Sequence, residues 1–161
     1  MEPCFETNAR DVPFFMKWIA SLIYKPLEPL PYVFLYGPQM GGKSTLIDAL
    51  ALINPDTVEI TSALNRAMAT ATLCVVDETL PPQEWVQSKY LILTRKDQRP
   101  QVIRNKTHWI QHSNDVRNCP TWVDVREFYM ERLTQPCDKA ILMNALKAEI
   151  PRLKEALNEY L

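Results

Sequence analysis

Glycine is scarce in this chain of 161 residues, which contains only three: Gly37, Gly41 and Gly42. Glycine makes up about 7% of an average protein, so both the low number and the clustering are informative. Glycine tolerates backbone conformations that a side chain obstructs. The sequence therefore predicts one place, near residue 40, where the backbone must curl around something.

Long hydrophobic runs and a charge imbalance are also missing. No apolar run approaches 18 residues and the N-terminus has no signal-peptide pattern, which argues against a membrane segment or secretion. The chain has 18 basic and 19 acidic residues and a net charge of −1, so its overall charge indicates neither a nucleic acid nor a membrane as partner. These features indicate a cytoplasmic protein, in a bacterial or a host cytoplasm.

Metal-binding patterns are absent as well. The four cysteines, Cys4, Cys74, Cys119 and Cys137, show no C-x-x-C spacing and are typical of reduced thiols in a cytosolic compartment. The two histidines, His108 and His112, fall on an expected strand. We therefore expect no metal held by side chains, apart from Mg²⁺ that accompanies a nucleotide.

What the chain does contain is an ordinary globular composition, with 47% hydrophobic and 23% charged residues. The length suits one domain with a proper core. We expect a single α/β domain over residues 1–161, with an N-terminal helix and linker at 11–30, a core at 31–133 and C-terminal helices at 134–161.

The three glycines lie in the stretch YGPQMGGKSTL, in which Gly37, Gly42, Lys43 and Ser44 fit the phosphate-binding pattern G-x-x-x-x-G-K-[ST]. An apolar run precedes it and another follows, which predicts a strand, a loop and a helix. Backbone N–H groups and the helix N-terminus would hold phosphate oxygens. Lys43 would neutralise the β- and γ-phosphates, and Ser44 would bind Mg²⁺. The expected nucleotide-binding residues are Gly37, Pro38, Gln39, Met40, Gly41, Gly42, Lys43, Ser44 and Thr45; the alternative is an accidental match in a turn.

A second motif is ATLCVVDE, an apolar strand from Ala71 to Glu78 that ends in two acids. In ATPases with such a loop, a buried strand delivers an Asp to Mg²⁺, and a nearby residue orients the attacking water. Asp77 and Glu78 suit these roles. The alternative is a solvated acidic turn before two prolines.

The segments Tyr90–Arg95 and Gln101–Asn105 flank a turn-forming centre, KDQRP, and predict a β-hairpin. Five basic residues lie between Arg95 and Lys106, against one acid. Such a hairpin is either a solvated edge protected by its charges or a finger that holds a phosphodiester backbone.

The remaining segments predict further elements. We expect an N-terminal helix capped by Asp11 and ended by the proline-rich stretch after it, a brief helix at Ser62–Met68, and a last strand in EFYMERL. We also expect two C-terminal helices separated by Pro151. His108–Asp115 is expected to be a strand whose polar end, Ser113-Asn114, lies beside Asp77 if the strands are adjacent and parallel.

The order of these motifs resembles superfamily 3 helicases, and most closely the phage and plasmid helicases that accompany primases. GPQMGGKST, CVVDE, YLILTRKDQRPQVIRN and THWIQHSNDVRNCP carry the similarity, which covers Phe14 to Leu161. The resemblance implies an AAA+-like P-loop NTPase of the additional-strand type with ATP and Mg²⁺ as cofactors. It also implies a hexameric ring on single-stranded DNA and a primase or another replication protein as partner.

The resemblance also implies roles for single residues. Asn114 matches the sensor asparagine that contacts the γ-phosphate and the attacking water. Lys96 and Arg99 lie near the tip of the expected DNA hairpin, with Arg95 and Arg104 beside them. For the arginine that reaches a neighbouring subunit's nucleotide, Arg126 in WVDVR is the best match and Arg117 a weaker one, although relatives often read G-D-T-R there.

The leading interpretation is thus an ATP-driven DNA helicase motor in which Lys43, Asp77, Glu78, Asn114 and Arg126 are catalytic. One alternative is a helicase-like adaptor or decoy without motor activity, and another is a small P-loop kinase. A kinase needs an arginine-bearing lid, whereas here a hairpin follows the acidic pair. No primase or origin-binding domain is evident, which suits either an excised domain or a small stand-alone protein.

Overall fold

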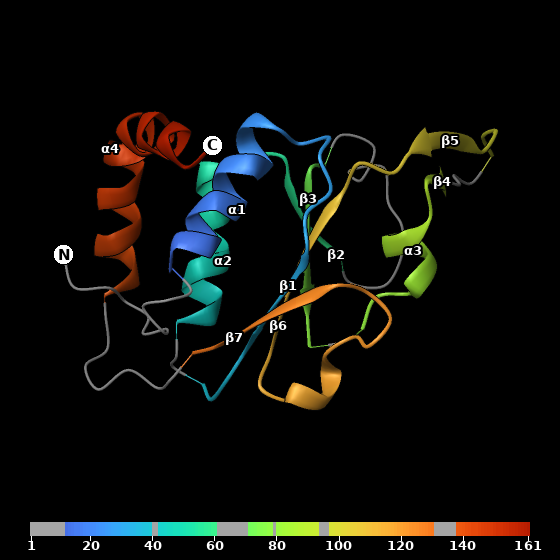
Figure 1. The fold of residues 1–161 in the computed structure, drawn as a ribbon, viewed down its shortest axis with the longest axis horizontal. Helices are drawn as coiled ribbons and strands as arrows, with labels where there is room; N and C mark the ends of the chain where they lie inside the picture. Colours follow the sequence, from blue (N-terminus) through green and yellow to red (C-terminus); the bar gives the residue numbers. More distant parts are fainter. Residues whose placement is uncertain (1–11, 40–41, 61–70, 79, 94–96, 131–137) are drawn as a thin grey trace.

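The computed structural model describes residues 12–39, 42–60, 71–78, 80–93, 97–130 and 138–161. At its centre lies a five-stranded sheet with the order β2-β3-β6-β1-β7, in which every neighbouring pair is parallel (Figure 1). In that order the strands are Thr57–Ile60, Leu73–Asp77, His108–Ser113, Tyr32–Tyr36 and Val125–Tyr129. The predicted α/β fold with a central parallel sheet is confirmed.

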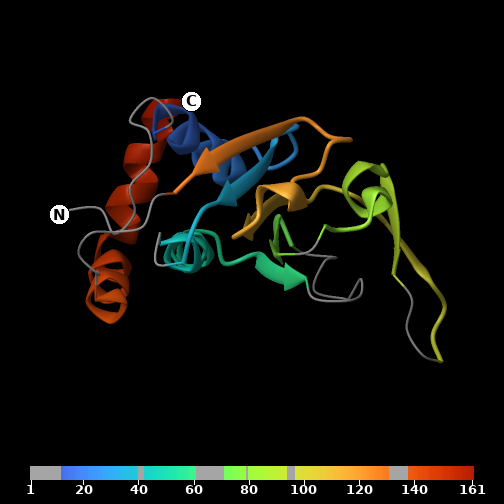
Figure 2. The same cartoon turned by 90° about the horizontal axis from the view of Figure 1, so that it is seen from below.

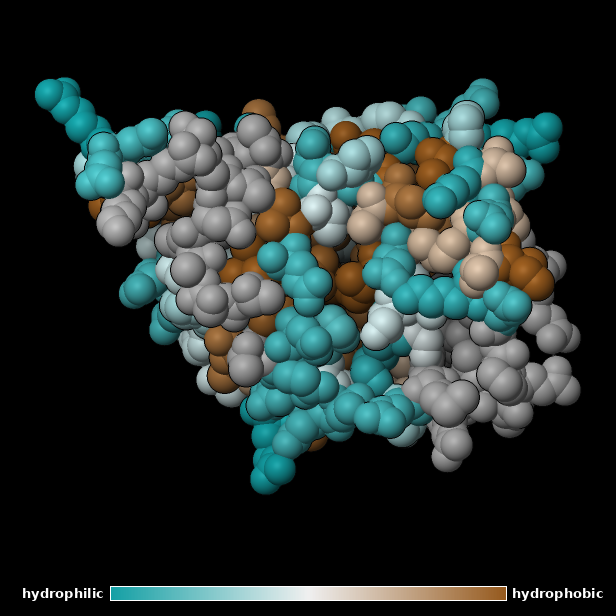
Figure 3. Space-filling model, turned by 180° about the vertical axis from the view of Figure 1, so that it is seen from behind, coloured by the Kyte–Doolittle hydropathy of each residue, from teal (hydrophilic) through white to brown (hydrophobic). Residues whose placement is uncertain are grey.

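The central strands are apolar because both faces of the sheet are covered, as is usual for parallel sheets. In β1, the four residues from Tyr32 to Leu35 are all buried, and in β3 the four from Leu73 to Val76 are buried. Alternate side chains point to opposite faces, so each of these two strands contributes residues to two hydrophobic clusters. The second cluster consists of Tyr32, Ile60, Ala71, Cys74, Val76, Leu91 and Trp109. The surface on the side away from the viewer in Figure 1 is mostly hydrophilic, with smaller hydrophobic areas (Figure 3).

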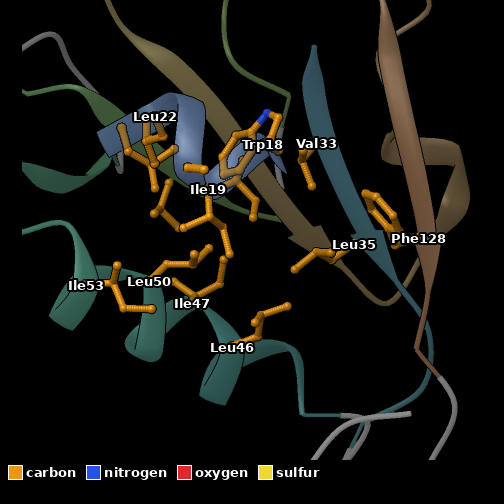
Figure 4. Close-up of a cluster of buried hydrophobic side chains, with 14 of the residues drawn as sticks. Trp18, Ile19, Leu22, Val33, Leu35, Leu46, Ile47, Leu50, Ile53 and Phe128 are labelled. Atoms are coloured by element: carbon orange, nitrogen blue, oxygen red, sulfur yellow. The ribbon is translucent and has the colours of Figure 1, made fainter. Parts of the chain in front are cut away.

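Helices α1 (Val12–Tyr24) and α2 (Lys43–Ile53) cover one face of the sheet. Their apolar side chains point toward the strands and toward each other (Figure 4). The indole Nε1–H of Trp18 donates to the carbonyl oxygen of Pro31, 3.0 Å away, which ties the helix to the linker before β1. This cluster of buried residues includes Trp18, Ile19, Leu22, Val33, Leu35, Leu46, Ile47, Leu50, Ile53, Leu73, Val75, Ile110 and Phe128.

Helix α4 (Lys139–Leu157) corrects one prediction: it continues through Pro151 as one helix, followed by the short 3-10 helix η3 (Asn158–Tyr160). Proline lacks an N–H and bends a helix, and α4 does bend along its length (Figure 1). It does not end, because residues beyond the proline pack on the core. Leu153 packs against the main cluster, Leu157 is fully buried, and the Tyr24 hydroxyl donates to the Lys154 carbonyl.

The opposite face of the sheet carries α3 (Gln83–Gln87) and an antiparallel pair, β4 (Tyr90–Leu93) with β5 (Gln101–Arg104). This pair confirms the predicted hairpin. It projects from the side of the molecule opposite α4 (Figures 1 and 2). Inward-facing residues such as Leu91 and Ile103 join the second hydrophobic cluster. The three apolar residues of the outer face, Tyr90, Ile92 and Val102, are 56%, 59% and 63% exposed.

Some predicted features lie outside the described residues, namely the Asp11 cap, the Ser62–Met68 helix and the end of the last predicted strand. Both histidines lie on a strand, β6, as expected. Within the described ranges, no helix has the length and apolar character needed to cross a membrane.

Candidate functional site

The carboxyl ends of three strands meet at one edge of the sheet and form a cavity there. Strand β6 lies between β1 and β3, so its end stands between the glycine loop and the acidic pair. The cavity has a volume of about 340 Å³. Its lining residues are Gln39, Gly42, Lys43, Ser44, Thr45, Asp77, Glu78, His112 and Asn114. We call this the strand-end cavity; all of its residues except His112 are candidate site residues from the sequence.

The loop after β1 approaches its neighbours so closely that only glycine fits at position 37. Gly37 has φ +146°, and a Cβ atom there would lie 2.2 Å from the carbonyl oxygen of Met130, just after β7. At the other end of the loop, Gly42 has φ +88° and precedes the first residue of α2. The glycines thus let the backbone turn sharply and start a helix whose positive end faces the cavity.

Lys43 begins α2, and its side chain folds back over the loop. The residue is only 7% exposed, and Nζ donates to the carbonyl oxygens of Gly37 at 2.8 Å and Pro38 at 2.7 Å. Burial lowers the pKa of Lys43, and the negative charge of Glu78 opposes that shift. The ammonium group is therefore held at the cavity with an acidic group near it, although solvent is largely excluded.

Glu78 follows β3 in an unusual conformation, with φ +61°. Its backbone N–H donates to the His112 carbonyl at 2.9 Å. Its carboxylate accepts two further hydrogen bonds, from the Ser113 hydroxyl to Oε2 at 2.7 Å and from the Asn114 backbone N–H to Oε1 at 3.1 Å. The end of β6 therefore fixes both the backbone and the carboxylate of Glu78. A left-handed conformation at a non-glycine residue costs free energy and is often found at functional sites.

Sequence reasoning considered His112 only as a zinc ligand and missed its place in the cavity. In the β3–β6 register it stands opposite Asp77, and its Nε2 lies 3.7 Å from Asp77 Oδ1. The His112 side chain is 14% exposed and that of Asp77 is 56% exposed. The signal that could have found it is register: parallel pairing of the two strands places residue 112 beside residue 77.

A buried polar network is hydrogen-bonded to Glu78, which lines the cavity. The amide of Gln111, which is fully buried, accepts from the Tyr32 hydroxyl at 2.5 Å and donates to the Asn118 carbonyl at 3.0 Å. Asn118 belongs to the 3-10 helix η2 (Val116–Asn118), and its Nδ2 donates to the Ser113 hydroxyl at 3.0 Å. Burial raises the pKa of Tyr32 far above its ordinary value, so this hydroxyl keeps its proton. The network therefore anchors η2 to the strands that form the site.

The two candidate arginines lie away from this cavity. Arg126, in β7, is exposed, and its guanidinium lies 4.5 Å from the centre of the Phe14 ring. Arg117, in η2, forms an exposed ion pair with Asp115 at 2.7 Å. Since the expected role of Arg126 is to reach a neighbouring subunit's nucleotide, its assignment stays a prediction. Met40 and Gly41 lie outside the described residues.

The two described candidate DNA-binding residues, Arg99 and Arg104, do not line the strand-end cavity. Arg99 and Arg104, on the hairpin, are exposed, whereas Arg95 and Lys96 lie outside the described residues. Tyr90 stands opposite Arg104, and Ile92 stands opposite Val102. The outer face of the hairpin thus combines an exposed arginine with exposed aromatic and aliphatic side chains.

The donor set of the strand-end cavity fits a phosphate group accompanied by a divalent cation. A buried ammonium, that of Lys43, and the N-terminus of α2 supply positive charge for an anion. The Ser44 hydroxyl and the Asp77 carboxylate are oxygen ligands of the kind that Mg²⁺ prefers. Glu78, held between donors on β6, supplies a carboxylate that can accept a proton.

At the level of sequence, no family model matches the chain, and no curated protein matches it either. Solved structures do match its fold. Two are described as the A form apo structure and the apo structure of the NrS-1 C-terminal region, each 17% identical, with TM-scores of 0.72 and 0.71. A further A form structure of that region is 19% identical, with a TM-score of 0.68.

Each of these matches covers 91% of this chain. The chain in turn spans 41% or 42% of the matched chains, which is about two fifths of their length. At such low identity the likeness concerns the fold alone.

Proposed function

We propose that the chain is a P-loop ATPase domain that binds ATP–Mg²⁺ in the strand-end cavity. The observation that carries this proposal is the convergence of Lys43 and Ser44 with Asp77, Glu78 and Asn114 around a single cavity. These residues come from three segments of the chain. An accidental loop motif or a solvated acidic turn gives no reason for such a convergence.

The strand order supports the additional-strand type within this class. Strand β6 separates β1, which leads into the glycine loop, from β3, which ends at the acidic pair. The inserted strand brings Asn114 to the cavity between those two motifs. That is the arrangement expected from the resemblance to superfamily 3 helicases.

In the proposed reaction, backbone N–H groups of the loop and Lys43 would bind the phosphates, and Ser44 and Asp77 would hold the metal ion. Bound Mg²⁺ would offset charge on the phosphate oxygens. Asn114 orients the attacking water. Glu78 takes a proton from that water as the water oxygen attacks the terminal phosphorus. The bond from that phosphorus to the bridging oxygen breaks, and ADP and phosphate leave.

We further propose that hydrolysis drives movement on single-stranded DNA during phage, plasmid or mobile-element replication. Support comes from the exposed basic hairpin, which stands apart from the nucleotide cavity, and from the ordered motifs of the resemblance. A ring of subunits, usually a hexamer in that family, would let Arg126 at the exposed edge strand reach a neighbour's nucleotide. A primase or another replication protein would be a partner.

The decisive experiment measures ATP hydrolysis with and without single-stranded DNA of mixed sequence. The motor proposal expects basal hydrolysis that rises on DNA addition, together with a larger mass in solution when an ATP analogue and DNA are both present. A rate of ATP hydrolysis that does not change on DNA addition would contradict the motor proposal and favour a kinase or a simple ATPase. DNA or partner binding without any hydrolysis would favour the adaptor or decoy.

A further inference from the structure

We infer that Ser113 is a positioning residue for Glu78: its hydroxyl aims the carboxylate that accepts the proton from the attacking water. This inference rests on the proposed function, because it concerns the base of the same hydrolysis. It adds a residue to which sequence reasoning assigned no role of its own. Ser113 is fully buried and does not line the cavity.

The hydrogen bonds around the Ser113 hydroxyl determine where its single proton points. Its oxygen accepts from the Asn118 side-chain amide and from the Asp115 backbone N–H, each at 3.0 Å. Two acceptors compete for the proton: Glu78 Oε2 at 2.7 Å and the Asp115 carbonyl at 3.1 Å. The bond to the charged carboxylate is the shorter and the stronger of the two. The hydroxyl therefore donates to Glu78.

The backbone conformation of Glu78 and the bond to its other carboxylate oxygen also restrict the carboxylate. Its φ of +61° and its backbone bond to the His112 carbonyl fix the direction in which the side chain leaves the chain. The Asn114 backbone N–H holds the other carboxylate oxygen. Within the described part of the chain, Ser113 is the one residue whose side chain hydrogen-bonds to the Glu78 carboxylate. A substitution there can consequently loosen the base without altering the fold of the loop that binds phosphate.

Removing the hydroxyl should lower turnover and leave nucleotide binding unchanged. The Ser113→Ala variant keeps Lys43, Ser44 and Asp77 in place but frees Oε2 of Glu78. Misplacing a reacting group by about 1 Å costs on the order of a hundredfold in rate. Because the Asn114 bond remains, we expect kcat to fall about ten- to a hundredfold while KM and the affinity for ADP–Mg²⁺ stay within about twofold.

The test is a double-mutant cycle on the full chain, with Ser113→Ala, Glu78→Gln and the double variant measured at saturating ATP–Mg²⁺. If Ser113 acts through Glu78, it should cause little further loss once Glu78 is replaced, since residues that act as a unit are non-additive. The matched control is Ser21→Ala, which removes the hydroxyl of another buried serine, in α1. The control should hydrolyse ATP at the wild-type rate.

Asn118→Ala provides a second route to the same answer if Ser113→Ala does not fold. That variant keeps the Ser113 hydroxyl but removes the donor that helps to orient it, so a several-fold fall in kcat is expected. Thermal unfolding and ADP–Mg²⁺ calorimetry establish folding and binding for each variant.

Three results would overturn the inference: wild-type turnover in folded Ser113→Ala, faster turnover, or a Ser113→Ala loss that multiplies fully with the loss from Glu78→Gln. A failure of the proposed function looks different, because Glu78→Gln itself would then hydrolyse ATP normally. An inactive Glu78→Gln variant beside a fully active Ser113→Ala variant contradicts the inference alone.

Discussion

The strand-end cavity and the hairpin lie in different parts of the molecule and are built in opposite ways. In the cavity, the side chains of Lys43 and Glu78 make two hydrogen bonds each, and Gly37 fits its place only because it lacks a Cβ atom. The hairpin is a separate two-stranded sheet whose outer face exposes Tyr90 and Arg104. The cavity side chains are thus fixed by bonds to neighbouring segments, whereas the hairpin packs on the rest of the molecule through one face only.

Because of this difference, we expect substitutions in the two regions to affect the two proposed activities differently. A site whose groups are interlocked loses function sharply when one atom changes, because no alternative geometry is available. A charged surface that grips a phosphodiester backbone loses affinity gradually, one contact at a time. Substitutions in the two regions should therefore differ both in size and in kind.

The largest effect is expected from Lys43→Ala. This change removes the one buried ammonium group of the cavity lining, and hydrogen bonds to charged groups contribute about 1.5–3 kcal/mol each. Binding of ADP–Mg²⁺ should weaken by at least about a hundredfold or be lost, as measured by calorimetry. Lys17→Ala, which removes an exposed lysine from α1, is the control and should bind normally. Unchanged affinity in a folded Lys43→Ala protein would exclude this cavity as the nucleotide site.

The next effect separates binding from chemistry. Glu78→Gln keeps the shape of the side chain but cannot accept a proton, and a positioned base contributes about 10²–10⁴ in rate. Steady-state hydrolysis should fall at least about a hundredfold while ADP–Mg²⁺ still binds. Near-normal turnover in this variant would move the base to another residue and weaken the proposal of a motor.

The site residues that could be predicted from the sequence are those that belong to a contiguous motif or follow from a general rule of parallel sheets. The loop residues follow from a contiguous pattern, and the placement of Asn114 beside Asp77 follows from the rule that parallel strands end at one edge. The bonds of Ser113 and Asn114 to Glu78 and the place of His112 were not predicted. They depend on the register between β3 and β6, and the paired segments lie some thirty-five residues apart in the chain.

The fold shows the same division between local signal and tertiary context. Strands, hairpin and helices follow from hydrophobic spacing, but the sequence also predicts that a helix is broken at Pro151. Burial of Leu157 and packing of Leu153 outweigh the hydrogen bond lost at the proline, so α4 continues and bends. The helix propensity of single residues does not reveal this balance between packing and the lost hydrogen bond.

Gly37→Ala tests how tightly the cavity is built, through stability and not through ligand binding. The added Cβ atom would lie 2.2 Å from the Met130 carbonyl oxygen at a φ of +146°, so the loop or the end of β7 must move. Backbone strain and overpacking each cost about 1–3 kcal/mol. The free energy of unfolding in urea, without nucleotide, should fall by about 3 kcal/mol. A loss below 1 kcal/mol would mean that the loop yields easily, and the contrast with the hairpin would weaken.

The smallest effect is expected at the hairpin, from the double variant Arg99→Ala/Arg104→Ala. Both residues are exposed and neither lines the cavity, so basal ATP hydrolysis should survive. Binding to single-stranded DNA should weaken for unrelated sequences alike, because phosphate contacts carry no sequence information. The matched control, Lys147→Ala/Arg152→Ala, removes two positive charges from α4, on the opposite side of the molecule (Figure 1).

Salt dependence gives the sharper readout. The logarithm of the binding constant falls with the logarithm of salt concentration with a slope of about −0.7 for each single-strand phosphate neutralised. Losing two contacts should make the slope less negative by about 1.4, whereas the α4 control, with the same change in net charge, should leave it unchanged. If both double variants shift the slope equally, the attraction is a diffuse effect of net charge and the hairpin is a solvated edge. If only the hairpin variant shifts it, the basic residues contact the strand directly.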